Sequence, residues 1–311
     1  MVITEEVKHI KQFIEMKLIG AYKNGNYTVA IYNDGTKVRR TDADKFIPEF
    51  PECMDVKLTD KCDGGCKFCY ENCTPNSPHS DILSQEWIHT VHPFTELAIN
   101  GNDLTHPQLV EFLELMKSKK VIVNITVNQR HFLDKFHFIK ELVDNNLIKG
   151  VGVSLTDSSS IELFERIKEV PNTVIHIIAG VVTEMDIKAL MRNSAKVLIL
   201  GYKIVGRGVK YYEQYRTSID RNQMVLKANL DKMVKNCSVV SFDNLALKQL
   251  GVKDLLFADR DDWDEFYMGD DGEYTFYIDA VAQTYSKNSL ESKIKRYPIK
   301  SSVTEMFDTF K

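Results

Sequence analysis

Apolar residues in the middle of the chain recur in short runs that helical patterns separate. Six runs fall at residues 54–58, 96–100, 121–127, 150–155, 173–180 and 196–201. Helical periodicity covers residues 108–119, 132–145, 161–169 and 184–192. Buried strands that alternate with helices are typical of parallel βα units. The pattern therefore predicts an α/β fold in which residues 51–205 form a partial barrel of six βα units, with ligands at the carboxyl ends of the strands.

The two ends of the chain follow other patterns. Residues 4–18 place apolar side chains near one helical face, and alternating residues on both sides of Asn33-Asp34-Gly35 predict a β-hairpin. We therefore expect residues 1–50 to be an N-terminal helix–hairpin appendage. Beyond residue 203 the pattern predicts a helix at 220–235 and strands at 239–242 and 273–281. Residues 206–311 are expected to form a C-terminal α/β cap that is also the substrate region.

Composition narrows the class of protein. The 311 residues are 43% hydrophobic and 27% charged, which is the balance of a globular protein and not of a disordered one. No apolar run reaches the roughly 18 residues that a transmembrane helix needs, and the first 20 residues lack the order of a signal peptide. We therefore expect a cytoplasmic protein. Forty Lys and Arg against 44 Asp and Glu give a net charge of −4, which disfavours bulk nucleic-acid binding.

Four of the six cysteines lie within twelve residues, directly after the first strand of the predicted barrel. They are Cys62, Cys66, Cys69 and Cys73, and Gly64 and Gly65 give the loop freedom to turn. Thiolate ligands that converge in this way select zinc or an iron–sulfur cluster. A structural zinc site usually takes a second Cys or His pair from elsewhere in the chain, and here the obvious partner is only Cys73. The spacing therefore disfavours zinc.

This loop resembles the signature of the radical S-adenosylmethionine (radical SAM) superfamily. That signature has three cysteines separated by three and then two residues, with an aromatic or apolar residue before the last cysteine. Cys62, Cys66, Phe68 and Cys69 match it, and the loop follows strand one as it does in the family. The resemblance implies a [4Fe–4S] cluster on the three cysteines, with the fourth iron open to S-adenosylmethionine and Phe68 near the adenine.

A second stretch matches the family's turn after strand two, which reads Gly-Gly-Glu-Pro-Leu-x-His-Pro and binds the methionine amino group. Here the turn covers residues 100–107, in which Gly101, Leu104, His106 and Pro107 match. Asn100 replaces the first glycine and Asn102 the glutamate. An amide oxygen can accept a hydrogen bond from an ammonium group, although without charge assistance. The resemblance thus implies cofactor contacts at Asn100, Gly101 and Asn102.

Further strand ends are similar to the family's cofactor-binding positions. Asn128 lies in a region similar to the third-strand Thr-Asn-Gly pattern, and Ser154 stands where the family often has a polar residue for the ribose or carboxylate. Residues 176–180 partly resemble an adenine-binding pattern, which makes Gly180 a candidate; His176 stands at its first glycine and Glu184 would have to be its glutamate. After strand six, Lys203 and Arg207 lie on a glycine-bearing stretch and predict an anion site for the substrate or the cofactor carboxylate. A flexible loop with solvated charges is the alternative interpretation.

Other candidate residues favour structural roles. Cys73 is expected to be a packed thiol, with a fourth cluster ligand as the alternative, and Cys237 is expected to be a core residue. We expect His106 and His176 to be structural, and Tyr70 to form a wall of the cluster pocket.

The resemblance implies an enzyme whose reduced cluster splits S-adenosylmethionine into methionine and a 5′-deoxyadenosyl radical, which takes hydrogen from a substrate. The implied partners are S-adenosylmethionine, an external one-electron donor of the flavodoxin or ferredoxin type, and a nucleotide, nucleic acid, peptide or small metabolite as substrate. Because only Cys237 follows Cys73, no auxiliary cluster on C-terminal cysteines is expected. A non-catalytic iron–sulfur protein that uses all four clustered cysteines is the alternative function.

Overall fold

A large, mostly parallel sheet forms the centre of the molecule. The structure is a computed structural model, and it describes residues 17–33, 35–102, 104–258 and 262–311. Within these ranges the sheet has ten strands in the order β10-β9-β8-β7-β6-β5-β4-β11-β12-β13. Neighbours from β10 to β11 are parallel, whereas β12 and β13 are added antiparallel at one edge. The chain is therefore an α/β protein, as the apolar pattern predicts.

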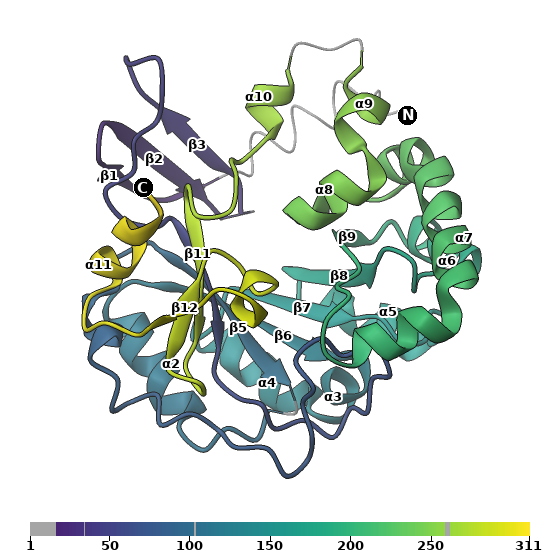
Figure 1. Cartoon of the computed structure of the whole chain (residues 1–311), viewed down its shortest axis with the longest axis horizontal. Coiled ribbons are helices and arrows are strands. Elements are labelled where there is room, and N and C mark those ends of the chain that lie inside the picture. Colours follow the sequence, from purple (N-terminus) through teal and green to yellow (C-terminus); the bar gives the residue numbers. More distant parts are fainter. Residues whose placement is uncertain (1–16, 34, 103, 259–261) are drawn as a thin grey trace.

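Each of the six apolar runs forms one strand of this sheet. These strands are β4 (Cys53–Lys57), β5 (Glu96–Asn102), β6 (Ile122–Asn128), β7 (Gly150–Ser154), β8 (Thr173–Ile178) and β9 (Lys196–Leu200). The helices between them are α2 (Leu109–Ser118), α3 (Gln129–Asp134), α4 (Phe136–Asp144), α5 (Ile161–Arg166) and α6 (Glu184–Arg192). Short 3₁₀ turns are η1 (Glu86–Thr90) and η2 (Ile167–Glu169). The helices lie along the outer side of the strands (Figure 1).

Alternation along the central strands separates two faces of the sheet. In β6, Val123, Ile125 and Val127 are buried in the main apolar core, which also takes in residues of α2 to α6. The residues between them, Asn124 and Thr126, point to the opposite face. A parallel sheet covered by helices on one face explains this division. The apolar core fixes the strands, and the other face carries the polar side chains.

The C-terminal third contributes to both edges of the same sheet. After helix α7 (Arg207–Asn236), β10 (Val239–Phe242) pairs with β9, while β11 (Thr275–Asp279) pairs with β4. The remaining elements are α8 (Asn244–Leu250), α9 (Val252–Leu256), α10 (Trp263–Phe266), β12 (Thr284–Ser286), η3 (Glu291–Lys293), β13 (Tyr297–Pro298), α11 (Val303–Phe307) and η4 (Asp308–Phe310). The segment expected to form a cap thus takes part in the central sheet.

Helix α7 is the largest departure from the expected elements. The sequence pattern predicts a helix only at 220–235, but α7 begins at Arg207 and is kinked at Tyr215, where φ is −120° and ψ is 20°. Gly208, Val209 and the tyrosines that follow have low helix propensity, so local sequence does not indicate this start. Tertiary contacts fix it, because the backbone N–H of Arg207 donates to the Cys69 carbonyl at 3.0 Å.

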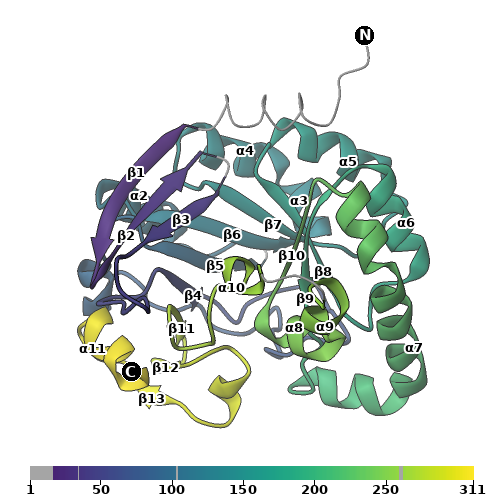
Figure 2. The ribbon, with the colours of Figure 1, turned by 90° about the horizontal axis from the view of Figure 1, so that it is seen from above.

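A small antiparallel sheet precedes the large one. It contains β1 (Leu18–Asn24), β2 (Tyr27–Tyr32) and β3 (Lys37–Arg40), of which β2 and β3 are the expected hairpin. The expected helix at 4–18 lies almost wholly outside the described residues, and Leu18 already belongs to β1. Tyr22, Tyr27, Val29, Ile31 and Phe50 form a separate core with Tyr274. This sheet and α7 lie on opposite sides of the molecule (Figure 2).

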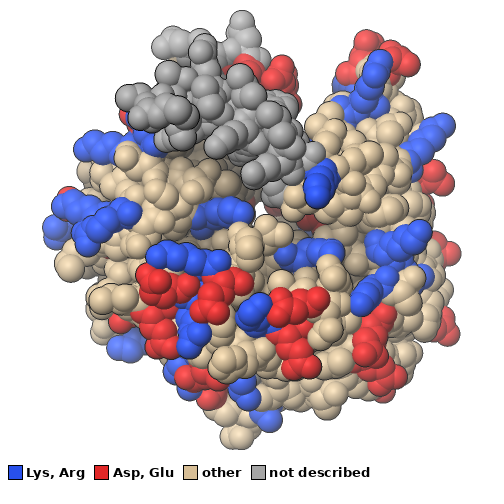
Figure 3. All heavy atoms as spheres, turned by 180° about the vertical axis from the view of Figure 1, so that it is seen from behind, with Lys and Arg blue, Asp and Glu red and all other residues tan. Residues whose placement is uncertain are grey.

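Charges of both signs are mixed on the surface. Lys and Arg alternate with Asp and Glu over the lower part of the face in Figure 3. No helix in the part of the chain that the structure describes is both long and apolar enough to cross a membrane.

Candidate functional site

The cysteine loop begins at the carboxyl end of β4, and its first residues lie beside its last ones. A bridge pairs Lys61 with Thr74, and the Cys62 N–H donates to the Thr74 carbonyl at 3.0 Å. Near the base, a Cβ placed on Gly64 would lie 3.3 Å from the Cys62 sulfur and 3.9 Å from the Cys66 sulfur. Gly65 has a φ of +63°, a left-handed conformation that glycine adopts without strain. The two glycines therefore allow the loop to turn with two thiols on the same side.

Asn100 and Asn102 bind the first residues of this loop. Asn100 Oδ1 accepts from the Leu58 and Thr59 N–H groups, and Asn100 Nδ2 donates to the Thr59 carbonyl at 2.7 Å. Asn102 Nδ2 donates to the Thr59 and Lys61 carbonyls at 3.1 and 3.0 Å and contacts the Cys73 sulfur at 3.7 Å. Both amides, which the family resemblance assigns to the cofactor, thus attach the end of β5 to the start of the cysteine loop.

Arg207 holds the far side of the loop. Its Nε donates to the Cys66 carbonyl and its Nη1 to the Cys73 carbonyl, both at 3.0 Å, in addition to its backbone bond to Cys69. Gly206 allows this approach, because a Cβ there would lie 2.4 Å from the Tyr70 carbonyl oxygen. A guanidinium has several donors in a rigid fork, so one side chain can hold two carbonyls at once. The loop is therefore attached to the start of α7.

Lys203, the other predicted cation, lies beside Tyr70. Its Nζ donates to Ser289 Oγ at 2.7 Å and lies 4.1 Å from the centre of the Tyr70 ring. The stretch that leads into α7 therefore has specific partners on the cysteine loop and in the C-terminal segment. Whether Lys203 and Arg207 also bind an anion stays a prediction.

Two of the predicted polar residues, Asn128 and Ser154, end neighbouring strands, and His176 lies near the end of the next one. Asn128 of β6 is the register partner of Ser154 of β7, and Ser154 is the partner of His176 of β8. Asn128 also caps α3, because its Oδ1 accepts from the Arg130 N–H at 2.9 Å, and its Nδ2 contacts the Cys66 sulfur at 3.8 Å. The structure thus brings the ends of β6, β7 and β8 together beside the cysteine loop.

Gly101, Gly180 and Phe68 have packing partners. A Cβ on Gly101 would lie 2.6 Å from Ile125, and one on Gly180 would lie 2.6 Å from Ile219 of α7, so both positions need glycine for packing. The Phe68 ring meets Tyr211 of α7 edge-on at 5.7 Å. These contacts place Phe68 between the cysteine loop and α7.

The face of the sheet opposite the helices, here called the inner face, is open to solvent near this site. Asp55 of β4 and Ala98 of β5 are register partners in the middle of two central strands, and both are exposed. Part of the Asp55 side chain reaches solvent, but protein atoms surround the rest of it. The resulting desolvation of the carboxylate raises its pKa to about 6, and the positive charge of Lys203 acts to lower it. The sequence gives no signal for Asp55, because β4 has the apolar pattern of a fully buried strand.

The thiols of the loop differ in their electrostatic surroundings. A hydrogen bond from the Cys73 thiol, together with the Cys73 and Glu71 N–H groups, lowers the pKa of Cys69 to about 6 in spite of burial. Burial and the neighbouring Cys69 raise the pKa of Cys66. Thiolate is the form that binds metals, so the donors around Cys69 favour a ligand role. Among the described residues, however, no three His, Cys, Asp or Glu side chains are already arranged around one metal position.

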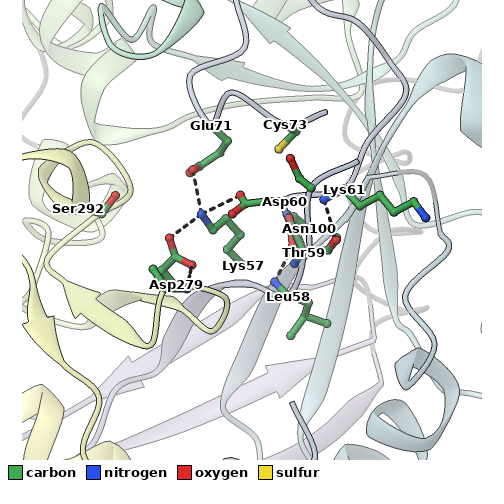
Figure 4. A network of polar contacts seen from close by, with 12 residues as sticks. Lys57, Leu58, Thr59, Asp60, Lys61, Glu71, Cys73, Asn100, Asp279 and Ser292 are labelled. Carbon is green, nitrogen blue, oxygen red and sulfur yellow. Dashed lines mark hydrogen bonds and ion pairs between the residues drawn. The ribbon is translucent and has the colours of Figure 1, made fainter. Parts of the chain in front are cut away.

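Two groups of charges beside the loop were not found from the sequence. Asp63 binds His131 Nε2 at 2.5 Å and Arg130 Nη2 at 2.6 Å, and these hydrogen bonds lower its pKa. On the other side, Lys57 meets Asp60, Glu71 and Asp279 (Figure 4). Burial acts to lower the pKa of Lys57, but the carboxylates outweigh it and raise the pKa above its ordinary value. Sequence spacing gives no signal for either group, because each joins residues from separate elements.

The remaining candidates have the surroundings of structural residues. Burial and the nearby His79 lower the pKa of His106 to about 4, and its Nδ1 accepts from the Gln108 N–H at 3.1 Å. The His176 ring lies over Gly152, where a Cβ would come within 2.3 Å of it, and burial lowers its pKa to about 4. Cys237 belongs to the main core, and Cys73 is buried beside Asn102.

Comparisons with known proteins give matches in structure but not in sequence. No protein-family model matches the chain, and no curated protein matches it. SuiB from Streptococcus suis, solved with S-adenosylmethionine bound, is similar with a TM-score of 0.53 and 15% identity. The similarity covers 85% of this chain and 66% of SuiB, slightly less than two thirds of that protein. Native anSMEcpe with bound AdoMet has a TM-score of 0.50 at 12% identity, covering 83% of this chain and 80% of that one.

The chain has the radical SAM superfamily fold. The identities of 15% and 12% support this statement for the fold and for no particular subfamily. The fold that the cysteine loop led us to expect is therefore confirmed.

Proposed function

We propose that this chain is a radical SAM enzyme that holds a [4Fe–4S] cluster on Cys62, Cys66 and Cys69 and cleaves S-adenosylmethionine reductively. The observation that carries the proposal is the cysteine loop, which has the superfamily's spacing and leaves the carboxyl end of β4 in a chain with the superfamily's fold. Thiolates are the usual ligands of such clusters, and the donors around Cys69 favour its thiolate. The donor set of the loop therefore fits the cluster.

The chain's own residues would supply position and shelter. When bound, the cluster supplies the electron for reductive cleavage of S-adenosylmethionine, and the resulting 5′-deoxyadenosyl radical takes hydrogen from a substrate. Asn100 and Asn102 hold the backbone at the start of the cysteine loop, and Arg207 holds it at Cys66 and Cys73. Such preorganisation fixes ligand geometry before binding. We propose cofactor contacts at Phe68, Asn100, Gly101, Asn102, Asn128, Ser154, Gly180, Lys203 and Arg207.

The finer architecture belongs to the same proposal. We propose that β4 to β9 form a partial (βα)₆ barrel within residues 51–205, flanked by an N-terminal unit (1–50) and a C-terminal substrate region (206–311). The exposed Asp55 and Ala98 on the inner face support a chamber there. A nucleotide, nucleic acid, peptide or small metabolite would enter it, and an external flavodoxin or ferredoxin would supply electrons. A reducing cytoplasm would keep the six free cysteines reduced.

The test is anaerobic reconstitution with iron and sulfide, followed by dithionite and S-adenosylmethionine. We expect 5′-deoxyadenosine and methionine in the wild type, and neither product in the Cys62→Ala, Cys66→Ala or Cys69→Ala variants. A cluster that is reduced by dithionite without any 5′-deoxyadenosine would contradict the proposal.

The second candidate function is an iron–sulfur electron carrier with four cysteine ligands. One observation favours it: the Cys73 thiol hydrogen-bonds to Cys69, so the fourth sulfur lies beside the proposed ligands. A closed, four-thiolate cluster would leave no iron for S-adenosylmethionine. The same assay separates the two functions, because a carrier would accept electrons and form no 5′-deoxyadenosine.

A further inference from the structure

One buried ammonium group contacts residues at both ends of the cysteine-bearing stretch. Lys57 is the last residue of β4, and its side chain is only 5% exposed. Its Nζ lies 2.9 Å from Asp60 Oδ1, which precedes Cys62 by two residues, and 3.3 Å from Glu71 Oε2, which follows Cys69 by two residues. Figure 4 shows the carboxylates converging on Nζ. The Lys57 side chain therefore joins the two ends of the stretch 60–71, which contains Cys62, Cys66 and Cys69.

The same ammonium group attaches the loop to the C-terminal segment. Lys57 Nζ lies 2.5 Å from Asp279 Oδ2 at the end of β11, the strand that pairs with β4. Glu71 receives two further contacts from this segment, from Tyr277 Oη at 3.1 Å and Lys293 Nζ at 2.5 Å. Asp279 Oδ1 in turn accepts from the Ala282 N–H at 2.9 Å. The loop ends are thus fixed against a strand more than 200 residues away in sequence.

Burial makes this arrangement different from a surface ion pair. The Lys57, Glu71 and Asp279 side chains are 5%, 8% and 7% exposed. Removing one partner of a buried charge group leaves the others without compensation, whereas exposed pairs contribute little. The geometry suits a constraint on the loop, because Lys57 has three N–H donors for three carboxylates, two from the ends of the cysteine-bearing stretch and one from β11.

We propose that Lys57 is a positioning residue for the cysteine loop, and that its bonds to Asp60, Glu71 and Asp279 are required to keep Cys62, Cys66 and Cys69 in place for their metal centre. The role of the metal centre rests on the proposed function. The constraint on the loop is a property of the chain alone, and it can be measured without a cluster.

The experiment compares Lys57→Met with Lys57→Arg and with Lys61→Met. Arginine keeps a charge and several donors, so it tests rescue. Lys61 is the matched control, because it lies next to Cys62 but its side chain extends away from the charge group in Figure 4. Glu71→Gln is the milder variant, since it removes one charge at one loop end while the amide can still bond to Tyr277. It keeps the test valid if Lys57→Met does not fold.

The first readout is the rate at which iodoacetamide alkylates Cys62, Cys66 and Cys69 in cluster-free protein, with the core residue Cys237 as internal reference. We expect Lys57→Met to raise this rate about tenfold and Glu71→Gln about threefold, because loosening the loop ends favours local opening. Lys57→Arg should recover most of the protection, and Lys61→Met should match the wild type. The second readout is iron retained after reconstitution and desalting, which we expect to fall in the same order.

Wild-type alkylation rates in both Lys57→Met and Glu71→Gln would overturn the positioning role, whatever the enzyme does. A wild type that forms no 5′-deoxyadenosine would instead contradict the proposed function, while the alkylation rates would still decide the role of Lys57. Equal loss of protection in Lys61→Met and Lys57→Met would also overturn the inference, because it would show an effect of charge near Cys62 and not of the bonds from Lys57.

Discussion

The loop after β4 and the turn after β8 are both strand-to-helix connections, but they are held in different ways. The turn after β8 ends in a capping box, in which Thr183 and Asp186 exchange hydrogen bonds over three residues. The cysteine loop has contacts from Asn100, which is 41 residues from Thr59, and from Arg207, which is 141 residues from Cys66. The turn after β8 also meets α7, because Asn222 Nδ2 donates to the Gly180 carbonyl at 3.2 Å. The difference is that the cap of α6 needs only local sequence, whereas the backbone of the cysteine loop is held by side chains that the completed fold brings to it.

The largest effect is expected where a long-range contact to the loop is removed. Arg207→Ala deletes two charge-assisted hydrogen bonds, each contributing about 1.5–3 kcal/mol, so the loop should open more easily. We expect iron retention and S-adenosylmethionine affinity to fall by at least about tenfold, which corresponds to 1.4 kcal/mol. Iron analysis and equilibrium dialysis with labelled S-adenosylmethionine would measure this.

The matched control for Arg207 lies on the same helix. Arg216 is 72% exposed, and its contacts are a 3.8 Å pair with Asp220 and a distance of 5.9 Å to the centre of the Tyr212 ring, so Arg216→Ala should leave both readouts unchanged. If Arg207→Ala also behaved like the wild type, the loop would not depend on α7, and the contrast with the turn after β8 would disappear.

A smaller effect is expected from the strand that leads into the second connection. Burial lowers the pKa of His176 to about 4, below the value of about 6.5 for an unfolded histidine. The unfolded chain therefore binds more protons between pH 6.5 and 4, so this histidine destabilises the fold as the pH falls through that window. In the wild type we expect this histidine to lower the free energy of unfolding by roughly 1–3 kcal/mol over that pH window, a range that allows for its partial exposure. His176→Gln should remove this loss.

Urea unfolding of the wild type and His176→Gln at pH 7.5 and pH 4.5 would measure that difference. The two proteins should lose unequal amounts of stability on acidification, with the larger loss in the wild type. Equal losses would mean that His176 is protonated as easily in the folded chain as in the unfolded one.

The smallest effect is expected at the local cap. Thr183→Ala should lower the free energy of unfolding by about 1 kcal/mol, which is typical for a lost N-cap. Iron retention should not change, because the hydrogen bonds of the capping box join Thr183 and Asp186 to each other and not to the cysteine loop. A loss of iron in Thr183→Ala at full secondary structure would show that the two connections are coupled, contrary to the comparison.

The same difference explains what could be predicted from the sequence. The six apolar runs located β4 to β9, because a buried strand needs a continuous apolar face whatever its neighbours. The helix at 184–192 was found with its true ends for a similar local reason. The predicted start of α7 lies too late in the sequence. Gly208 and Val209 have low helix propensity, and tertiary contacts fix the helix there instead.

The site shows the limit more clearly. The spacing of Cys62, Cys66 and Cys69 carried the superfamily resemblance, and the fold agrees with it. The bonds from Asn100 to the Thr59 backbone, and the charge group around Lys57, depend on how β4, β5 and β11 pair. No motif records such pairing, so the sequence points to Asn100 without its contact to the loop and gives no signal for Lys57.

The most direct test of the central claim, a cluster on three cysteines and open to S-adenosylmethionine, is the iron content of two variants of neighbouring thiols. Cys69→Ala and Cys73→Ala would be reconstituted anaerobically and compared with the wild type by iron analysis and by electron paramagnetic resonance of the reduced protein. The account predicts about four irons per chain in Cys73→Ala and in the wild type, and loss of the cluster in Cys69→Ala. Equal loss of iron in both variants would contradict it, because Cys73 would then be a ligand and the site would be closed.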